Sequence, residues 1–246
     1  MTPGVFKFSG RIAEGDPRHT MIESMDDVAA GGLIIAPNYV PSSWGAVPQY
    51  AAPVVDTVTG YAPATDCNGY FMSDKYQPNN NCYAYGCNFA SNSFPQPGRA
   101  SGAPNLFSNF TPQQVISNAE SDGLINIGST VADIASHAAT GATGHYVALM
   151  FSTPENSIGG DPNANWPGDY HWARCDVLSS PMSWSQKDGG DQVTNFDFAG
   201  NPITDPSTAN WTVNQGPISS TDANEYIVTY DFLTFMFVPN GAVNIL

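Results

Sequence analysis

The sequence predicts an α+β fold, with helices in the first half packed on a mostly antiparallel sheet from the second half. Residues 112–122 carry a well-delimited helix signal. Residues 144–152 are apolar at almost every position after an initial histidine, which is typical of a central strand. Residues 168–178 alternate in polarity, and residues 224–239 form a long aromatic-rich stretch that reads as a strand pair or one bent strand. Because helical signals precede strand signals rather than alternating with them, α+β is favoured over a parallel α/β sheet.

The predicted helix over 112–122 has identifiable ends. Thr111 is a good N-cap, and Pro112 stands at the first helical position, where its missing N–H costs nothing. Gln114 completes a capping box with Thr111. Gly123 suits the left-handed conformation that ends many helices.

The first 66 residues differ from the remainder of the chain. They contain repeated prolines and little helical periodicity, with short apolar runs at 32–37 and 52–61 and one short helical candidate at 21–32. We therefore predict two parts, an extended Pro-rich arm with short strands over 1–66 and an α+β domain over 67–246. The arm is expected to lie on the domain or to reach a protein partner, including a second copy of the chain.

The charge balance excludes some classes of partner. Seven Lys and Arg stand against 22 Asp and Glu, for a formal net charge of −15. This leaves no basic footprint for nucleic acid, and an anionic membrane surface would repel it. The sequence has no apolar run of 18 residues and begins without the apolar core of a signal peptide, so no membrane span is expected. Its low charged fraction of 12% is common in secreted and virion proteins. The sequence leaves the location open, with virion association and the cytoplasm as the two options considered.

Cys82 is the candidate nucleophile. It follows three asparagines, and an Asn at position 80 or 81 would cap a short helix that places the Cys82 thiol in its first turn. The helix dipole there lowers a thiol pKa. A buried structural cysteine, half of a zinc site with Cys87, and a Cys67–Cys87 or Cys82–Cys87 disulfide are alternatives. Zinc is disfavoured because no second ligand pair follows, and we expect no metal or other cofactor.

Two of the four histidines lie on predicted strands. His145 begins the strand over 144–152, and His171 lies on the next strand, where it shares a face with Ala173 and Cys175. Adjacent antiparallel strands would place the two imidazoles side by side. The structural alternatives are a hydrogen-bonded histidine at a strand start for His145 and a packed strand residue for His171.

The order of these motifs resembles the papain-like superfamily, and within it the NlpC-type and CHAP-type peptidases and amidases. The resemblance rests on the NCYAYG segment at 81–86 and the GHYVAL segment at 144–149. It implies a papain-like fold for 67–246, with Cys82 as nucleophile, His145 as base and His171 as the residue that orients the base. NlpC-type enzymes usually have a small residue, Ser and then Gly soon after the cysteine, whereas this chain reads CYAYG from Cys82 onward. This departure leaves the substrate class open. These motifs and the segments around 96–102 and 169–206 also resemble a group of bacterial and phage proteins with no secure activity.

Three further residues are candidates for substrate binding. The Asn81 side chain, with the backbone N–H of Cys82, is placed to stabilise an oxyanion. Arg99 lies in a turn and is suited either to an internal carboxylate or to a carboxylate of the substrate. Trp172, with Trp166 and Trp184, would form either a sugar-stacking wall or part of the core. Aspartates in Gly-rich and Asn-rich loops suggest calcium only weakly, because no EF-hand pattern is present: Asp161, Asp169, Asp188 and Asp191.

Two functions of different classes follow. The first is a cysteine hydrolase that cleaves an amide bond, in a peptide or a peptidoglycan stem peptide, through the Cys82 thiolate. The second is a non-catalytic structural or binding protein of a phage virion or a cell surface. The Pro-rich arm, the scarcity of charge and the apolar C-terminus favour the second function.

Overall fold

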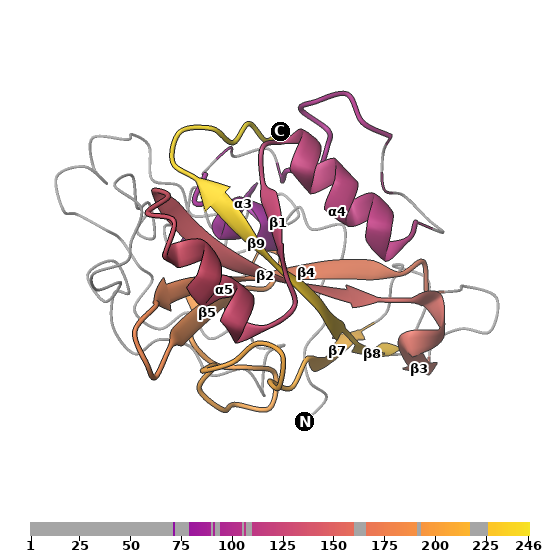
Figure 1. The fold of residues 1–246 in the computed structure, drawn as a ribbon. Helices are drawn as coiled ribbons and strands as arrows, with labels where there is room; N and C mark the ends of the chain where they lie inside the picture. The colour runs from indigo at the N-terminus through magenta and orange to yellow at the C-terminus, as the bar shows by residue number, and fades with distance from the viewer. Residues whose placement is uncertain are drawn as a thin grey trace, which may run out of the picture.

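The computed structural model shows a six-stranded antiparallel sheet in the order β1-β9-β2-β4-β5-β6 and a separate three-stranded sheet in the order β3-β8-β7 (Figure 1). The structure describes residues 71, 79–89, 91, 94–104, 106, 110–159, 166–190, 193–216 and 226–246. The predicted arm over 1–66, with its helix and short strands, lies outside these residues.

Helices dominate the first half of the described chain and strands the second. The helices are α3 (Cys82–Gly86), α4 (Pro112–Ser121), α5 (Val131–Ala138) and the 3-10 turn η3 (Pro154–Asn156). The strands of the larger sheet are β1 (Ile125–Gly128), β2 (Gly144–Ser152), β4 (Asp169–Val177), β5 (Ser183–Lys187), β6 (Val193–Thr194) and β9 (Asp231–Pro239). Those of the smaller sheet are β3 (Ser157–Gly159), β7 (Thr212–Gly216) and β8 (Tyr226–Thr229).

The larger sheet separates two cores. On one face, alternate residues of β2, β4 and β9 pack with the buried residues of α3 and α4. On the other face, the intervening residues pack with Ile134 of α5 and with aromatic side chains from the loops around 198–211. Figure 1 shows β2, β4 and β9 crossing the middle of the molecule between these groups. Both faces of β2 are buried, which confirms the prediction of a central strand.

The sequence prediction for α4 is confirmed. Thr111 caps the helix with Pro112 at its start, and both halves of the capping box with Gln114 form. Gly123 has φ of +105°, and a Cβ there would approach the carbonyl oxygen of Ala242 to 2.6 Å. The end of α4 is therefore fixed both by local conformation and by the C-terminal segment packed against it.

The α+β class with a mostly antiparallel sheet is confirmed. The segment over 224–239 forms two strands, β8 and β9, which belong to different sheets. The strand β1 and the helix α5 were not predicted as such. None of the helices in the described part of the chain combines the length and apolar character needed to cross a membrane.

Candidate functional site

The short helix α3 begins where the asparagine run predicts. Asn81 has extended backbone angles, and its side-chain oxygen accepts a hydrogen bond from the N–H of Ala84 at 3.1 Å. Its side-chain nitrogen donates to the carbonyl of Pro95 at 2.7 Å. Both ends of the Asn81 amide are therefore committed to structure, which argues against its expected role as an oxyanion donor.

Cys82 occupies the first turn of α3 and lies against the backbone of β4. Its Sγ is 4.0 Å from the carbonyl oxygen of Tyr170, a long contact in which the thiol is the donor. The described β4–β5 register runs from the Val177–Ser183 pair to the Ala173–Gln186 pair. The thiol thus lies beside β4 three residues before Ala173, outside the part of β4 that pairs with β5.

The environment of Cys82 is opposite to that expected of an activated thiol. Burial raises its pKa strongly, and the nearby carboxyls of Asp169 and Asp188 raise it further. A backbone N–H of Trp172 and the ammonium of Lys187 lower it by less. The predicted lowering of the pKa by the helix start is therefore outweighed, and Cys82 is a protonated thiol at neutral pH.

His145 lies at the other end of α3 from the thiol. Its Nε2 donates to the carbonyl of Gly86 at 2.7 Å, four residues, or about 6 Å of helix rise, beyond Cys82. Its Nδ1 is buried and has no hydrogen-bond partner among the described residues. Burial lowers the pKa of His145 to about 3, so the imidazole is neutral.

The expectation that His145 and His171 lie side by side is wrong. His171 pairs with Met150, five residues along β2 from His145, a separation of about 16 Å at the usual rise of a strand. Met150 belongs to the core on the far face of the sheet, whereas Val147, two residues from His145, belongs to the core that contains α3. Alternation therefore also places the two imidazoles on opposite faces.

Gln186, which was not singled out in the sequence, fixes the tautomer of His171. The Nε2 of Gln186 donates to the carbonyl of Phe196 at 2.8 Å, so its Oε1 faces His171. His171 Nε2 lies 2.6 Å from that oxygen and must donate the proton. Burial lowers the pKa of His171 to about 4, so the ring is neutral and its Nδ1 keeps a free lone pair.

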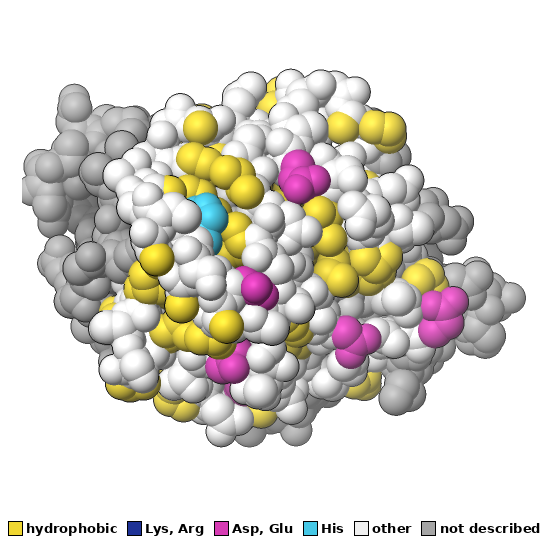
Figure 2. Space-filling model, in the orientation of Figure 1, with side chains coloured by type: hydrophobic (Ala, Val, Ile, Leu, Met, Phe, Trp, Pro, Cys, Tyr) yellow, Lys and Arg dark blue, Asp and Glu magenta, His cyan; other side chains and the backbone are white. Residues whose placement is uncertain are grey.

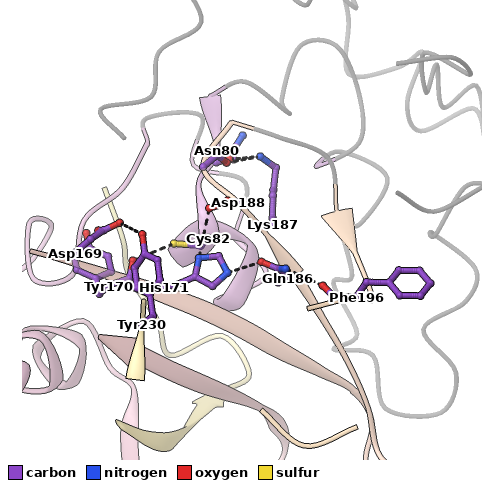
Figure 3. Close-up of polar contacts among 11 residues, drawn as sticks. Asn80, Cys82, Asp169, Tyr170, His171, Gln186, Lys187, Asp188, Phe196 and Tyr230 are labelled. Atoms are coloured by element: carbon purple, nitrogen blue, oxygen red, sulfur yellow. Dashed lines mark hydrogen bonds and ion pairs between the residues drawn. The ribbon is translucent and has the colours of Figure 1, made fainter. Parts of the chain in front are cut away.

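Figure 3 shows what lies around the His171 ring. Dashed lines join Asp188 to the Nδ1 side of the ring and Gln186 to the Nε2 side. The Oδ1 of Asp188 is 3.8 Å from Nδ1. Burial, together with the charge of Asp169, raises the pKa of Asp188 well above its usual value. The Nδ1 atom of His171 thus faces a buried carboxyl, whereas the Cys82 thiol belongs to the core on the other face of the sheet.

Two other predicted binding residues are placed differently. Trp172 is fully buried and packs on Tyr83 at a ring-centroid distance of 5.1 Å, and Trp166 and Trp184 are also core residues. These tryptophans therefore form no sugar-stacking wall. The Nη2 of Arg99 donates to the carbonyl of Phe94 at 2.6 Å, and Arg99 is half-buried.

Two of the three Lys and Arg side chains in the described part of the chain are buried, and the third, Arg99, is half-buried. Arg174 is buried and bonds Asp176, and Lys187 is buried and donates to the carbonyls of Asn80 and Gly189. The face shown in Figure 2 accordingly displays acidic side chains and no Lys or Arg. The acidic side chains on this face would repel a phosphate backbone.

The remaining cysteine and metal alternatives are also decided for the described residues. Cys82, Cys87 and Cys175 are buried free thiols, so neither disulfide considered above is formed. No group of three His, Cys, Asp or Glu side chains in this part of the chain is arranged to hold a metal ion. Of the aspartates considered for calcium, Asp169 and Asp188 lie in the cluster around His171, and the other two lie outside the described residues.

Comparison with known proteins gives one informative relative. The chain is 34% identical over 147 residues to insoluble matrix shell protein 1 of Ruditapes philippinarum, and the match covers 59% of this chain and 78% of the relative. The chain belongs to the family of insoluble matrix shell protein 1. No family model matches the chain, and no solved structure matches it. Membership of this family favours the structural alternative over the cysteine hydrolase, and nothing found bears on a phage or on an amide substrate.

Proposed function

We propose that the protein is a non-catalytic structural protein that assembles with protein partners in an insoluble matrix. The observation that carries this proposal is the 34% identity with insoluble matrix shell protein 1 over 78% of that protein's length. The state of the candidate site supports it. A protonated thiol and two neutral, buried histidines do not form the thiolate–imidazolium pair that a cysteine hydrolase uses.

Self-association of the full-length protein tests the structural role. Sedimentation velocity over a hundredfold range of concentration, followed by pelleting, should show growth into large species. Cys82→Ser should behave like the wild type, because the thiol has no part in assembly under this proposal. A protein that stays monomeric at every concentration while hydrolysing an amide bond, with activity lost in Cys82→Ser, would overturn the proposal.

A cysteine hydrolase of papain-like fold is a second candidate, and one observation favours it. Cys82 occupies the first turn of α3, which is the position that the resemblance gives to the nucleophile. In this candidate His145 is the base, because alternation along β2 places it with Val147 on the face of the sheet that packs with α3.

Alkylation of the thiols separates the two candidates. Iodoacetamide at about pH 6 should label Cys82 rapidly and selectively if it is an activated nucleophile. Slow labelling of Cys82 at the rate of Cys87 and Cys175 is expected of the structural protein, because all three are buried. Labelling should be followed for each cysteine separately by peptide mass spectrometry.

A further inference from the structure

The turn that follows β9 contains an asparagine in a chemically labile setting. β9 ends at Pro239, and the next two residues, Asn240 and Gly241, are both exposed. The N–H of Ala242 donates to the carbonyl of Pro239 at 3.4 Å, and Gly241 has φ of +68°, so the chain turns sharply here. An asparagine followed by glycine loses its side-chain amide readily, because glycine has no side chain to hinder attack by its backbone nitrogen.

The groups that would react in this turn are unobstructed. Among the described residues, neither the Asn240 side chain nor the Gly241 N–H has a hydrogen-bond partner. A Cβ built on Gly241 would meet no atom within 4 Å. The nitrogen of Gly241 is therefore free to approach Cγ of Asn240, and the space that a cyclic intermediate needs is open to solvent.

Asn156 provides a contrast within the same molecule. It is followed by another small residue, Ser157. The side-chain nitrogen of Asn156 donates to Oδ2 of Asp231 at 2.7 Å, and its backbone N–H donates to the carbonyl of Thr153 at 3.0 Å. Ser157 begins β3, which pairs with β8. Because both its side chain and the backbone after it are held, Asn156 does not readily reach the geometry of attack.

The turn also connects β9 to the segment that anchors the C-terminus. Figure 1 shows this segment running from the end of β9 to the C-terminus beside α4. The N–H of Asn244 donates to the carbonyl of Asp122 at 3.0 Å, and Ile245 is buried in the core that contains α4. These contacts depend on the length and direction of the backbone that leaves Pro239.

We propose that Asn240 is a site of spontaneous deamidation and that its iso-aspartyl product loosens the C-terminal segment 242–246 from α4. The nitrogen of Gly241 gives up its proton and bonds to Cγ of Asn240, the bond from Cγ to the side-chain nitrogen breaks, and ammonia leaves. Water then opens the cyclic imide to aspartate or iso-aspartate. The iso-aspartyl form adds a carbon atom to the main chain inside the turn. This inference goes beyond the proposed structural role and needs no enzyme or cofactor.

Incubation of the full-length protein in neutral and mildly alkaline buffer, followed by peptide mass spectrometry, measures deamidation at each asparagine. The same incubation in guanidinium chloride gives the rate of each site without the fold. Folding should slow Asn156 by about tenfold or more and Asn240 by less than about threefold. The rate at Asn240 should rise with pH, because the attacking nitrogen must lose its proton. An Asn240 that reacts in the unfolded chain but not in the folded protein overturns the proposal.

Two variants test the chemistry of the site. Gly241→Ala should slow deamidation of Asn240 by about tenfold or more, because the added methyl group hinders the attacking nitrogen. Alanine is strained at this positive φ, and a loosened turn by itself would speed the reaction, so slowing cannot come from loosening. Asn240→Gln should show no conversion at this position, because its longer side chain must close a larger ring. An unchanged rate in Gly241→Ala overturns attack by the glycine nitrogen.

Hydrogen exchange tests the structural consequence. Ion exchange separates the deamidated protein, which carries an additional negative charge, and an iso-aspartyl methyltransferase identifies the iso-aspartyl fraction. The Asn244 N–H should exchange about tenfold faster in that fraction than in the unmodified protein. Asn240→Asp, which adds the charge without lengthening the main chain, is the matched control and should exchange like the wild type. Equal exchange in the iso-aspartyl fraction and the wild type overturns the loosening of 242–246, independently of assembly or hydrolysis.

Discussion

Replacement of His145 by Gln should remove a defined part of the acid sensitivity of the fold. The His145 ring is fully buried between β2 and the end of α3, and its pKa is lowered to about 3 by burial. A glutamine can donate to the same Gly86 carbonyl but does not titrate. The difference in unfolding free energy between the two proteins therefore isolates the imidazole.

The sign and size of the effect follow from the two pKa values. The folded-state pKa lies below the unfolded value of about 6.5, so only the unfolded chain binds the proton between them. The contribution of His145 to stability is thus complete above about pH 6.5 and is lost as the pH falls toward 3. At pH 4.5, two units below the unfolded value, the loss is about 2.7 kcal/mol.

Urea denaturation followed by tryptophan fluorescence measures this difference. Unfolding free energies of the wild type and His145→Gln should be determined at about pH 7.5 and about pH 4.5, with m-values checked for two-state behaviour. The packing defect of the variant does not depend on pH and cancels when the two conditions are subtracted. The gap between the proteins should then shift by about 2–3 kcal/mol in favour of the variant at the lower pH.

The reasoning would be refuted if the difference in unfolding free energy between the wild type and His145→Gln changed by less than about 0.5 kcal/mol between the two pH values. The folded protein would then accept a proton on His145 almost as readily as the unfolded chain. A shift in the opposite direction would mean that the folded state stabilises the imidazolium. Either result would remove burial as the dominant influence on this ring.

Three other predictions use the same denaturation assay. Arg174→Met should cost about 3–5 kcal/mol, because it leaves the buried Asp176 carboxylate without its guanidinium, and adding Asp176→Leu should restore much of that loss. Thr130→Ala should lower the unfolding free energy by about 1 kcal/mol, because it removes the capping box of α5. Ser136→Ala, on the exposed side of the same helix, should lower it by less, and equal losses in the two variants would argue against the cap. Asp169→Asn should flatten the stability curve between about pH 4 and pH 8. Burial raises the pKa of Asp169 to about 8, so the wild type binds an extra proton when folded and loses stability as the pH rises through this range. A wild-type curve with no greater slope than the variant's would contradict that pKa.

Local signals in the sequence were sufficient for much of the fold. The ends of α4 are set by side chains within three residues of the helix, and the burial of β2 on both faces shows in its uninterrupted apolar run. The capping box of α5 was equally local, but this helix has eight residues and Ile134 is its buried residue. The strand β1 has four residues and is stabilised by pairing with β9, which lies far from it in the sequence.

The site was harder to predict, because it depends on register between strands. Sequence alternation correctly assigns His171 to the face of Ala173 and Cys175, but nothing local shows that Met150 rather than His145 lies opposite it. The same limitation hid Gln186, which meets His171 only through the pairing of β4 with β5. The start of α3 was predicted correctly, yet its effect on the thiol was overridden by burial and by two carboxyls distant in sequence.

The inward position of Lys187 limits cross-linking of this protein through lysine amines. Reagents and enzymes that cross-link proteins through primary amines require an accessible, unbonded ε-amino group. Lys187 is the one lysine in the described part of the chain, and it is fully buried with two carbonyl acceptors. The chain's other two lysines are Lys7 and Lys75. Amine-based cross-linking therefore cannot act on Lys187, and in the proposed matrix role the described domain would be joined by non-covalent contacts or by bonds that do not involve lysine.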